Sequence, residues 1–341
     1  MEKWRKIFSL ALMSVALFTF VPGGVQARDN DSCCDPCYDP CDCGGFEVGV
    51  DFLWWKPCVG DLDYAAVKKD SKFKHKGICP DWEPGFRVYI GKADVCCGGG
   101  FGASYTCVSS KSSSSTKKDG EVVLGYGHPG FLTNKGRYDK GKGSYDVNYQ
   151  EWDLLASYGS SNGECSQSSY YFGVAGINLD QEFKAEIRQN SPARIRNKWD
   201  SDYWGVGLRI GADYKRRICD CFSFFANGQA SILAGESCAK SRFDSQDSNT
   251  NFDHKFTEEE VCRVVPGYHV GAGFSYDTCV CDWDFSFRVG YEFLSWHNIP
   301  SRRTYVSDEK IGDEIEAALS TSSNSQTFGF HGLFAGFQLS F

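Results

Sequence analysis

The sequence has very little methionine and, after its first 27 residues, no long apolar run. Both methionines, Met1 and Met13, lie in that opening segment of the 341-residue chain. A membrane-spanning helix needs about 20 consecutive apolar residues, so the remainder of the chain is predicted to contain none. Any membrane crossing would therefore have to be made by strands.

Basic residues are fewer than acidic ones. The chain carries 36 Lys and Arg against 44 Asp and Glu, a formal net charge of −8. An acidic balance argues against nucleic acid as a partner. We therefore predict no nucleic-acid binding.

Motifs for catalysis and cofactor binding are also missing. The six histidines form no ligand pair at helical or alternating spacing. GYGHPG (125–130) has the glycines of a dinucleotide loop, but Pro129 prevents the helix that must follow. GRYDKGKG (136–143) resembles a phosphate loop but ends in Gly143, where Ser or Thr would bind magnesium. We predict no enzyme, no catalytic residues, no cofactor and no metal site, with an outer-membrane barrel enzyme as an open alternative.

The first 27 residues have the pattern of a secretory signal peptide. A basic segment at 3–6 precedes an apolar run at 7–21, and residues 25–27 read Val-Gln-Ala, a small-x-small cleavage signature. We expect cleavage after Ala27, with an uncleaved anchor as the alternative. Cleavage removes three basic residues and one acidic residue, so the net charge falls from −8 to −10.

Short runs that alternate apolar and polar residues dominate the rest of the chain. WGVGLRIGADYK (204–215), PGYHVGAGFSYD (266–277) and WDFSFRVGYEF (283–293) each place aromatic or aliphatic residues on one face only. A soluble sandwich also alternates. The membrane interpretation is favoured by aromatic residues at the strand ends and by the C-terminal LFAGFQLSF (333–341). A terminal aromatic on an amphipathic strand is the signal read by the barrel assembly machinery, so Phe341 is the predicted assembly signal.

We predict an all-β fold, a transmembrane antiparallel up-and-down β-barrel of ten strands spanning 46–341. The segment EVVLGYG (121–127) leaves twelve strands as an alternative. The connectors alternate between long and short, as in outer-membrane barrels with short periplasmic turns. The predicted strands are 46–56, 84–92, 100–108, 144–157, 169–180, 203–215, 222–235, 262–276, 283–296 and 331–341.

Several of these segments together resemble the Legionella-type major outer membrane protein family. The resemblance is carried by DFLWWKP (51–57), WDSDYWGVGLRIGADYK (199–215), FSFFANGQASILAGES (222–237), PGYHVGAGFSYD (266–277) and FRVGYEFLSWHNIP (287–300). It implies a β-barrel porin in the bacterial outer membrane. The chain departs from the family in its cysteine load, which suggests the envelope of Chlamydia-like bacteria, where disulfides do mechanical work.

The chain has 17 cysteines, and twelve of them fall on the predicted periplasmic side. Five lie in the segment 28–45, which we interpret as a Cys-rich periplasmic tail, and seven lie in the short turns. In an oxidising compartment such thiols form disulfides. We predict cross-links, some between molecules, to copies of this chain or to other Cys-rich envelope proteins. The twelve are Cys33, Cys34, Cys37, Cys41, Cys43, Cys96, Cys97, Cys165, Cys219, Cys221, Cys279 and Cys281.

Two further pairs are disulfide candidates in the outer loops: Cys58 with Cys79, and Cys238 with Cys262. Metal binding and redox catalysis are the alternatives for the tail. Cys34 and Cys37 have a zinc-like spacing, but no second pair follows at ligand distance. We interpret the tail as a cross-linking segment.

The polar faces of the strands predict a hydrated lumen of mixed charge. The function we predict is a porin for small hydrophilic solutes with little charge preference. A non-conducting structural or adhesive outer-membrane protein is the second hypothesis, because ten strands lie near the filled end of barrel sizes. The predicted pore-lining residues are Arg87, Arg209, Asp213, Lys215, Asn227, Gln229, His269, Asp284, Arg288 and Glu292.

Overall fold

The computed structural model describes residues 45–69, 72–96, 99–123, 138–161, 165–188, 194–219, 221–246, 251–257, 261–280, 283–301, 304–306, 320–322 and 325–341. The predicted signal peptide and the five cysteines of the tail lie outside these residues. Within them, no helix is long and apolar enough to cross a membrane.

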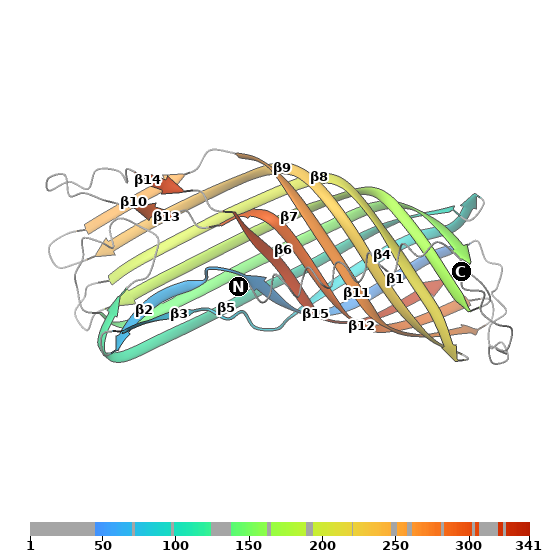
Figure 1. The fold of residues 1–341 in the computed structure, drawn as a ribbon, viewed down its shortest axis with the longest axis horizontal. Coiled ribbons are helices and arrows are strands. Elements are labelled where there is room, and N and C mark those ends of the chain that lie inside the picture. Colours follow the sequence, from blue (N-terminus) through green and yellow to red (C-terminus); the bar gives the residue numbers. More distant parts are fainter. Residues whose placement is uncertain are drawn as a thin grey trace.

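The described residues form one closed antiparallel barrel of ten strands (Figure 1). Each strand pairs with its neighbours in chain order, and β1 pairs with β15 to close the circle. Closure satisfies the backbone groups of both edges, as a lipid environment requires. The strands are β1 (Phe46–Val59), β4 (Glu83–Cys96), β5 (Gly99–Val123), β6 (Tyr138–Ser161), β7 (Ser166–Arg188), β8 (Arg194–Cys219), β9 (Phe222–Gln246), β11 (Val261–Val280), β12 (Trp283–Pro300) and β15 (Ser325–Ser340).

The all-β barrel and its ten strands are therefore confirmed, and the twelve-strand alternative is wrong. Residues 121–123 extend β5 and form no strand of their own. The remaining described strands lie outside the ten. They are β2 (Asp63–Lys69), β3 (Lys72–Gly77), β10 (Asn251–Thr257), β13 (Thr304–Val306) and β14 (Ser320–Ser322).

The two ends of the barrel differ. At one end, here named the turn end, only a few residues join consecutive strands, as at 220–221 between β8 and β9. The chain termini of the barrel meet there, since Phe46 and Phe341 exchange backbone hydrogen bonds of 2.8 and 3.0 Å. The opposite end, the loop end, carries β10, β13 and β14 (Figure 1).

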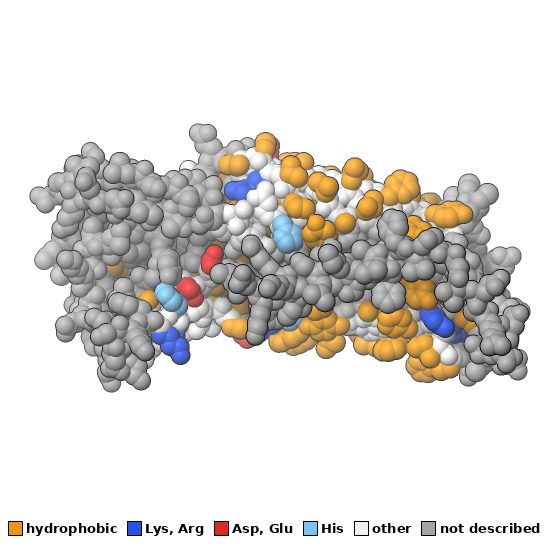
Figure 2. All heavy atoms as spheres, in the orientation of Figure 1, with side chains coloured by type: hydrophobic (Ala, Val, Ile, Leu, Met, Phe, Trp, Pro, Cys, Tyr) orange, Lys and Arg blue, Asp and Glu red, His pale blue; other side chains and the backbone are white. Residues whose placement is uncertain are grey.

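An apolar belt surrounds the barrel towards the turn end. Hydrophobic side chains stand exposed on the outer face there, and Figure 2 shows them gathered over that part of the molecule. Exposure of so many large apolar side chains fits a lipid-facing surface and no aqueous one. Members of the belt include Phe52, Phe86, Phe101, Leu154, Phe172, Leu208, Ile210, Ile232, Phe274, Phe287, Leu333 and Phe337.

The strands run further towards the loop end than the sequence pattern predicts. β8 begins at Arg194 and not at 203, and β9 continues to Gln246 and not to 235. In these extensions the outer face is charged, as in the contact of Lys198 with Glu182 at 2.7 Å. The described residues of the expected long outer loops are therefore mostly strand. Alternation of apolar and polar residues weakens on the loop-end side of the belt, and the predicted strands are too short for that reason.

Candidate functional site

The lumen at the turn end contains a cavity of about 760 Å³ with many charged side chains in its walls. That volume is in the range of small-molecule sites. Its walls carry five basic and five acidic side chains, so the local formal charge is balanced. The ten residues are Arg87, Lys92, Arg209, Lys215, Arg288, Glu47, Asp51, Glu151, Asp153 and Asp213.

Ion pairs that cross the lumen form a charged layer at the inner end of this cavity. Arg87 on β4 contacts Asp51 on β1 and Glu292 on β12, both at 3.2 Å. Arg288 also reaches Asp51, at 2.9 Å. Strands β4 and β12 are separated by β1 and β15, so the Arg87–Glu292 pair spans barrel strands that are not neighbours. Gly336 makes room for Asp51, because a Cβ at that glycine would overlap the carboxylate.

Arg209 completes the charged layer from the opposite wall. Its side chain is 1% exposed and contacts the carboxylates of Glu151 and Asp153, the latter at 2.6 Å. Its Nε donates to Ser231 at 2.8 Å. Removing charges from water is costly unless each is paired and hydrogen-bonded, which is the arrangement here.

His269 links the charged layer to β9. Its Nε2 lies 2.7 Å from Glu292 Oε2, and its Nδ1 lies 2.7 Å from Gln229 Nε2. The indole of Trp55 donates to the other Glu292 oxygen at 3.0 Å. The charged layer is therefore Asp51, Arg87, Glu151, Asp153, Arg209, His269, Arg288 and Glu292.

An aromatic layer lies directly on the loop-end side of the charged layer. Trp296 donates its indole N–H to the Tyr149 hydroxyl at 3.0 Å, and Tyr149 donates to Glu151. The Tyr149 ring lies 5.3 Å from that of Phe330, although β6 and β15 are not neighbouring strands. All five members are at most 1% exposed: Trp55, Tyr149, Trp296, Phe328 and Phe330.

The connection between β1 and β4 folds into the barrel on the loop-end side of the aromatic layer. Tyr64 on β2 packs over Gly143, where any side chain would overlap its ring, and its hydroxyl lies 3.3 Å from Ser114 Oγ. Ala65 and Val67 are buried as well. Among the described residues, buried side chains therefore pack across the lumen on the loop-end side of the charged layer.

Most of the predicted pore-lining residues lie around one cavity. Eight of the ten line it, and Glu292 is buried in the charged layer beside it. Asp284 is half-buried near the turn end, opposite Cys279 and Ser340. Their role in passing solutes stays a prediction.

Sequence reasoning missed several members of the two layers. Asp51 and Asp153 each stand between large apolar residues, as in VDF and WDL, and Glu151 lies two residues before Asp153 on the same strand face, so this alternation could have identified them as lumen-facing. The aromatic layer had no such signal. Trp55 and Trp54 are adjacent in the sequence, yet one is 1% exposed and the other 41%.

Few of the predicted cross-linking cysteines can be placed. Cys165, Cys219 and Cys221 lie at the turn end, where the backbone of Arg217 donates to the carbonyl of Cys165 at 2.9 Å. Cys165 is disulfide-bonded, whereas Cys219 is an exposed free thiol and Cys221 a half-buried one. The side chains of the other nine lie outside the described residues.

The two outer pairs are not joined in the structure. Cys58 and Cys79 are exposed free thiols, and Cys262 is an exposed free thiol as well. Cys262 lies opposite Glu236, which puts Cys238 on the diagonal, about 7–8 Å away and beyond normal disulfide reach. Both pairings stay predictions, and the second would require the strands to shift. Among the described residues, no group of three or more His, Cys, Asp or Glu side chains is arranged to hold a metal ion.

Comparison with known proteins gives one family match. The model of the Legionella pneumophila major outer membrane protein precursor family matches residues 38–341. No curated protein matches the chain.

The solved structures that resemble the chain are distant. The outer membrane protease OmpT from Escherichia coli is 9% identical, with 87% of this chain and 97% of that chain covered and a TM-score of 0.41. A mutant of the monoaromatic hydrocarbon channel TodX is 11% identical, with coverages of 87% and 89% and a TM-score of 0.29. A major outer membrane protein from Thermus thermophilus is 13% identical, with coverages of 66% and 97% and a TM-score of 0.24. TM-scores this low support no inference about function.

Proposed function

This chain belongs to the Legionella major outer membrane protein family and lies in the bacterial outer membrane, and from that premise we propose that it is a narrow porin for small hydrophilic solutes. The observation that carries the proposal is the charge-lined cavity of about 760 Å³ inside the apolar belt. A lumen lined by paired charges and amides suits hydrated solutes.

The barrier that closes this cavity consists of side chains. The contact of Tyr149 with Phe330 and the pair of Arg209 with Asp153 are examples. Side chains change rotamer far faster than backbone elements rearrange. Passage through the barrel therefore requires the charged and aromatic layers to part, which predicts small and intermittent conductance steps.

A second candidate function, a non-conducting structural barrel, is favoured by one specific observation. Trp55, Trp296 and Phe328 are fully buried at 0–1% exposure, which is the packing of a protein core. A barrel filled in this way would act through its place in the envelope and not as a path for solutes.

Conductance in planar bilayers separates the two functions. The matched variants are Phe330→Ala, which removes a ring from the aromatic layer, and Phe337→Ala, which removes one from the lipid-facing surface of the same strand. A porin gives small steps in the wild type, larger steps with Phe330→Ala and unchanged steps with Phe337→Ala. If none of the three proteins gives conductance steps, although each is shown to be folded and inserted, the structural candidate is favoured.

The cross-linking role is part of the same proposal. We propose that the tail cysteines, together with the thiols of the turn end, join barrels to one another or to other Cys-rich proteins on the periplasmic side. The exposed thiol of Cys219 at the turn end supports this. A barrel is already closed by backbone hydrogen bonds, so extra links at one end add little to its own stability. We also propose that the barrel assembly machinery inserts this chain and is therefore one of its partners.

A further inference from the structure

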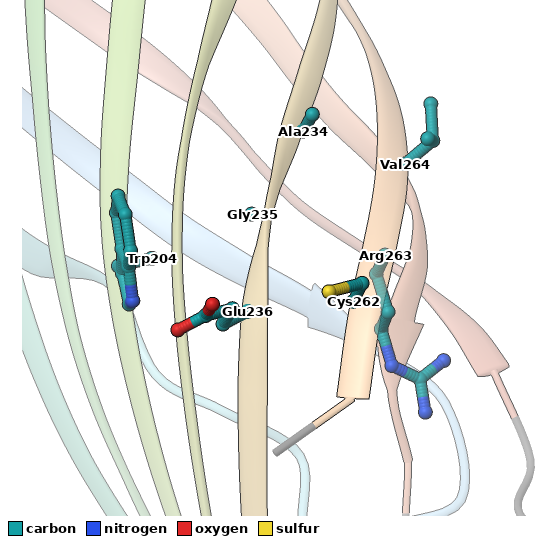
Figure 3. Close-up of a pocket in the computed structure, with 7 residues that line it drawn as sticks. All are labelled: Trp204, Ala234, Gly235, Glu236, Cys262, Arg263 and Val264. Atoms are coloured by element: carbon teal, nitrogen blue, oxygen red, sulfur yellow. The ribbon is translucent and has the colours of Figure 1, made fainter.

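A small notch interrupts the outer surface of the barrel at the loop-end margin of the apolar belt. It crosses β8, β9 and β11 and has a volume of about 290 Å³ (Figure 3). The side chains that form it are Trp204, Ala234, Glu236, Cys262 and Val264, with Gly235 and Arg263 contributing at its floor and edge.

The notch exists because small residues lie between large ones. Ala234 is paired with Val206 on one side and Val264 on the other, and it leaves a depression between them. Trp204, which is 55% exposed, forms a wall one row further towards the loop end. The depression is continuous with the lipid-facing surface, since Val264 and Ile232 are 56% and 63% exposed.

Glu236 is the first charged residue beyond the belt on β9. Its cross-strand neighbours are Trp204 and Cys262, and neither supplies a positive charge. The Arg263 guanidinium points away from the notch in Figure 3, and its Nε donates to Ser237 at 2.9 Å. Among the described residues, Glu236 has no ion-pair partner.

An exposed indole beside an unpaired carboxylate is a combination that attracts ammonium groups. Tryptophan gives the strongest cation–π attraction of the aromatic side chains, and a carboxylate accepts charge-assisted hydrogen bonds from N–H donors. A phosphate-only headgroup would instead meet the negative charge of Glu236. The occupant that fits both parts of the notch is thus a lipid with one apolar chain in the depression and a positive group at its outer edge.

We propose that the notch binds a phospholipid whose headgroup carries a primary ammonium. An acyl chain lies against Ala234 and Val264, and the ammonium lies between the Trp204 ring and the Glu236 carboxylate. This lipid site goes beyond the proposed solute path, because it is on the outside of the barrel and does not depend on whether the lumen conducts.

Native mass spectrometry of the detergent-solubilised full chain tests the site. The probes are dioleoyl phosphatidylethanolamine and dioleoyl phosphatidylglycerol at equal concentration. We expect the ethanolamine lipid to be retained about fivefold more, the ratio that roughly 1 kcal/mol gives. Glu236→Gln, which keeps the shape of the notch, should reduce the ratio to about one.

A pair of matched variants separates the notch from the general lipid surface. Ala234→Phe fills the depression and should abolish the preference. Ala230→Phe adds the same ring two rows away, between Ile210 and Tyr268, and should leave it intact. Heat-modifiable mobility on gels establishes that each variant is folded. Equal retention of the two lipids by the wild type, a preference that survives Glu236→Gln, or equal effects of the two Phe variants would each overturn the proposal.

Discussion

Arg209 holds two buried carboxylates in the charged layer, so its removal is the sharpest test of the lumen described here. In Arg209→Met, Glu151 and Asp153 lose their shared cation while remaining at 4% and 7% exposure. Breaking a buried ion pair by removing one partner typically costs about 3–5 kcal/mol. We expect the variant to lose about that much free energy of unfolding in urea, measured by tryptophan fluorescence of the refolded barrel.

Two control variants test whether the loss of stability comes from unpaired buried charges. Lys111→Met removes a partner of Asp146 on the outer wall, where the lysine side chain is 81% exposed, and should cost less than about 1 kcal/mol. Arg209→Met combined with Glu151→Gln and Asp153→Asn removes the orphaned charges and should recover most of the loss. If Arg209→Met alone is as mild as Lys111→Met, the layer is hydrated and the description of a closed lumen is wrong.

The remaining predictions concern assembly, cross-linking, the outer wall and selectivity. Phe341→Asp should reduce insertion and leave periplasmic aggregate, because the terminal strand would lose its recognition element and the packing of Phe341 on Trp283, whose ring centroid is 5.4 Å away; normal surface exposure would count against the assembly signal. Replacing Cys33, Cys34, Cys37, Cys41 and Cys43 with Ser should weaken disulfide ladders on non-reducing gels of envelopes and leave conductance intact, whereas stoichiometric zinc on the wild-type segment would favour the metal alternative. On the outer wall, burial tends to raise the pKa of Glu182, but hydrogen bonds from Lys184 and Lys198 outweigh it and lower that pKa to about 2. The stabilisation is therefore present above the ordinary pKa near 4.5 and lost as pH falls through about 2, so Glu182→Gln should cost less than about 1 kcal/mol at pH 7 and progressively less as the pH is lowered towards 2 in urea titrations. The balanced charge of the cavity predicts similar permeabilities for potassium and chloride, and a reversal potential in a salt gradient that indicates one ion alone would contradict it.

Local pattern determined the turn-end halves of the strands. In WGVGLRIGADYK (204–215) the residues at even positions face lipid and those at odd positions face the lumen, and the structure has the same division, with Leu208 70% exposed and Arg209 1% exposed. A strand with one face in lipid and one in a polar lumen must alternate apolar and polar residues. The sequence therefore predicts this part of the fold. The short connectors and the ten strands follow from the same signal.

Only the tertiary structure decided what the lumen contains. The partners of Arg87, Glu292 and Arg209 come from other strands, and the register across the barrel brings them together over separations such as the 205 residues between Arg87 and Glu292. Mixed charge on the strand faces was equally compatible with an open pore and with a filled one. Whether Tyr149 meets Phe330 depends on barrel diameter and strand stagger, which are properties of the closed sheet and not of any one strand. Sequence alone therefore determined that these side chains face inward, and barrel closure determined that they meet.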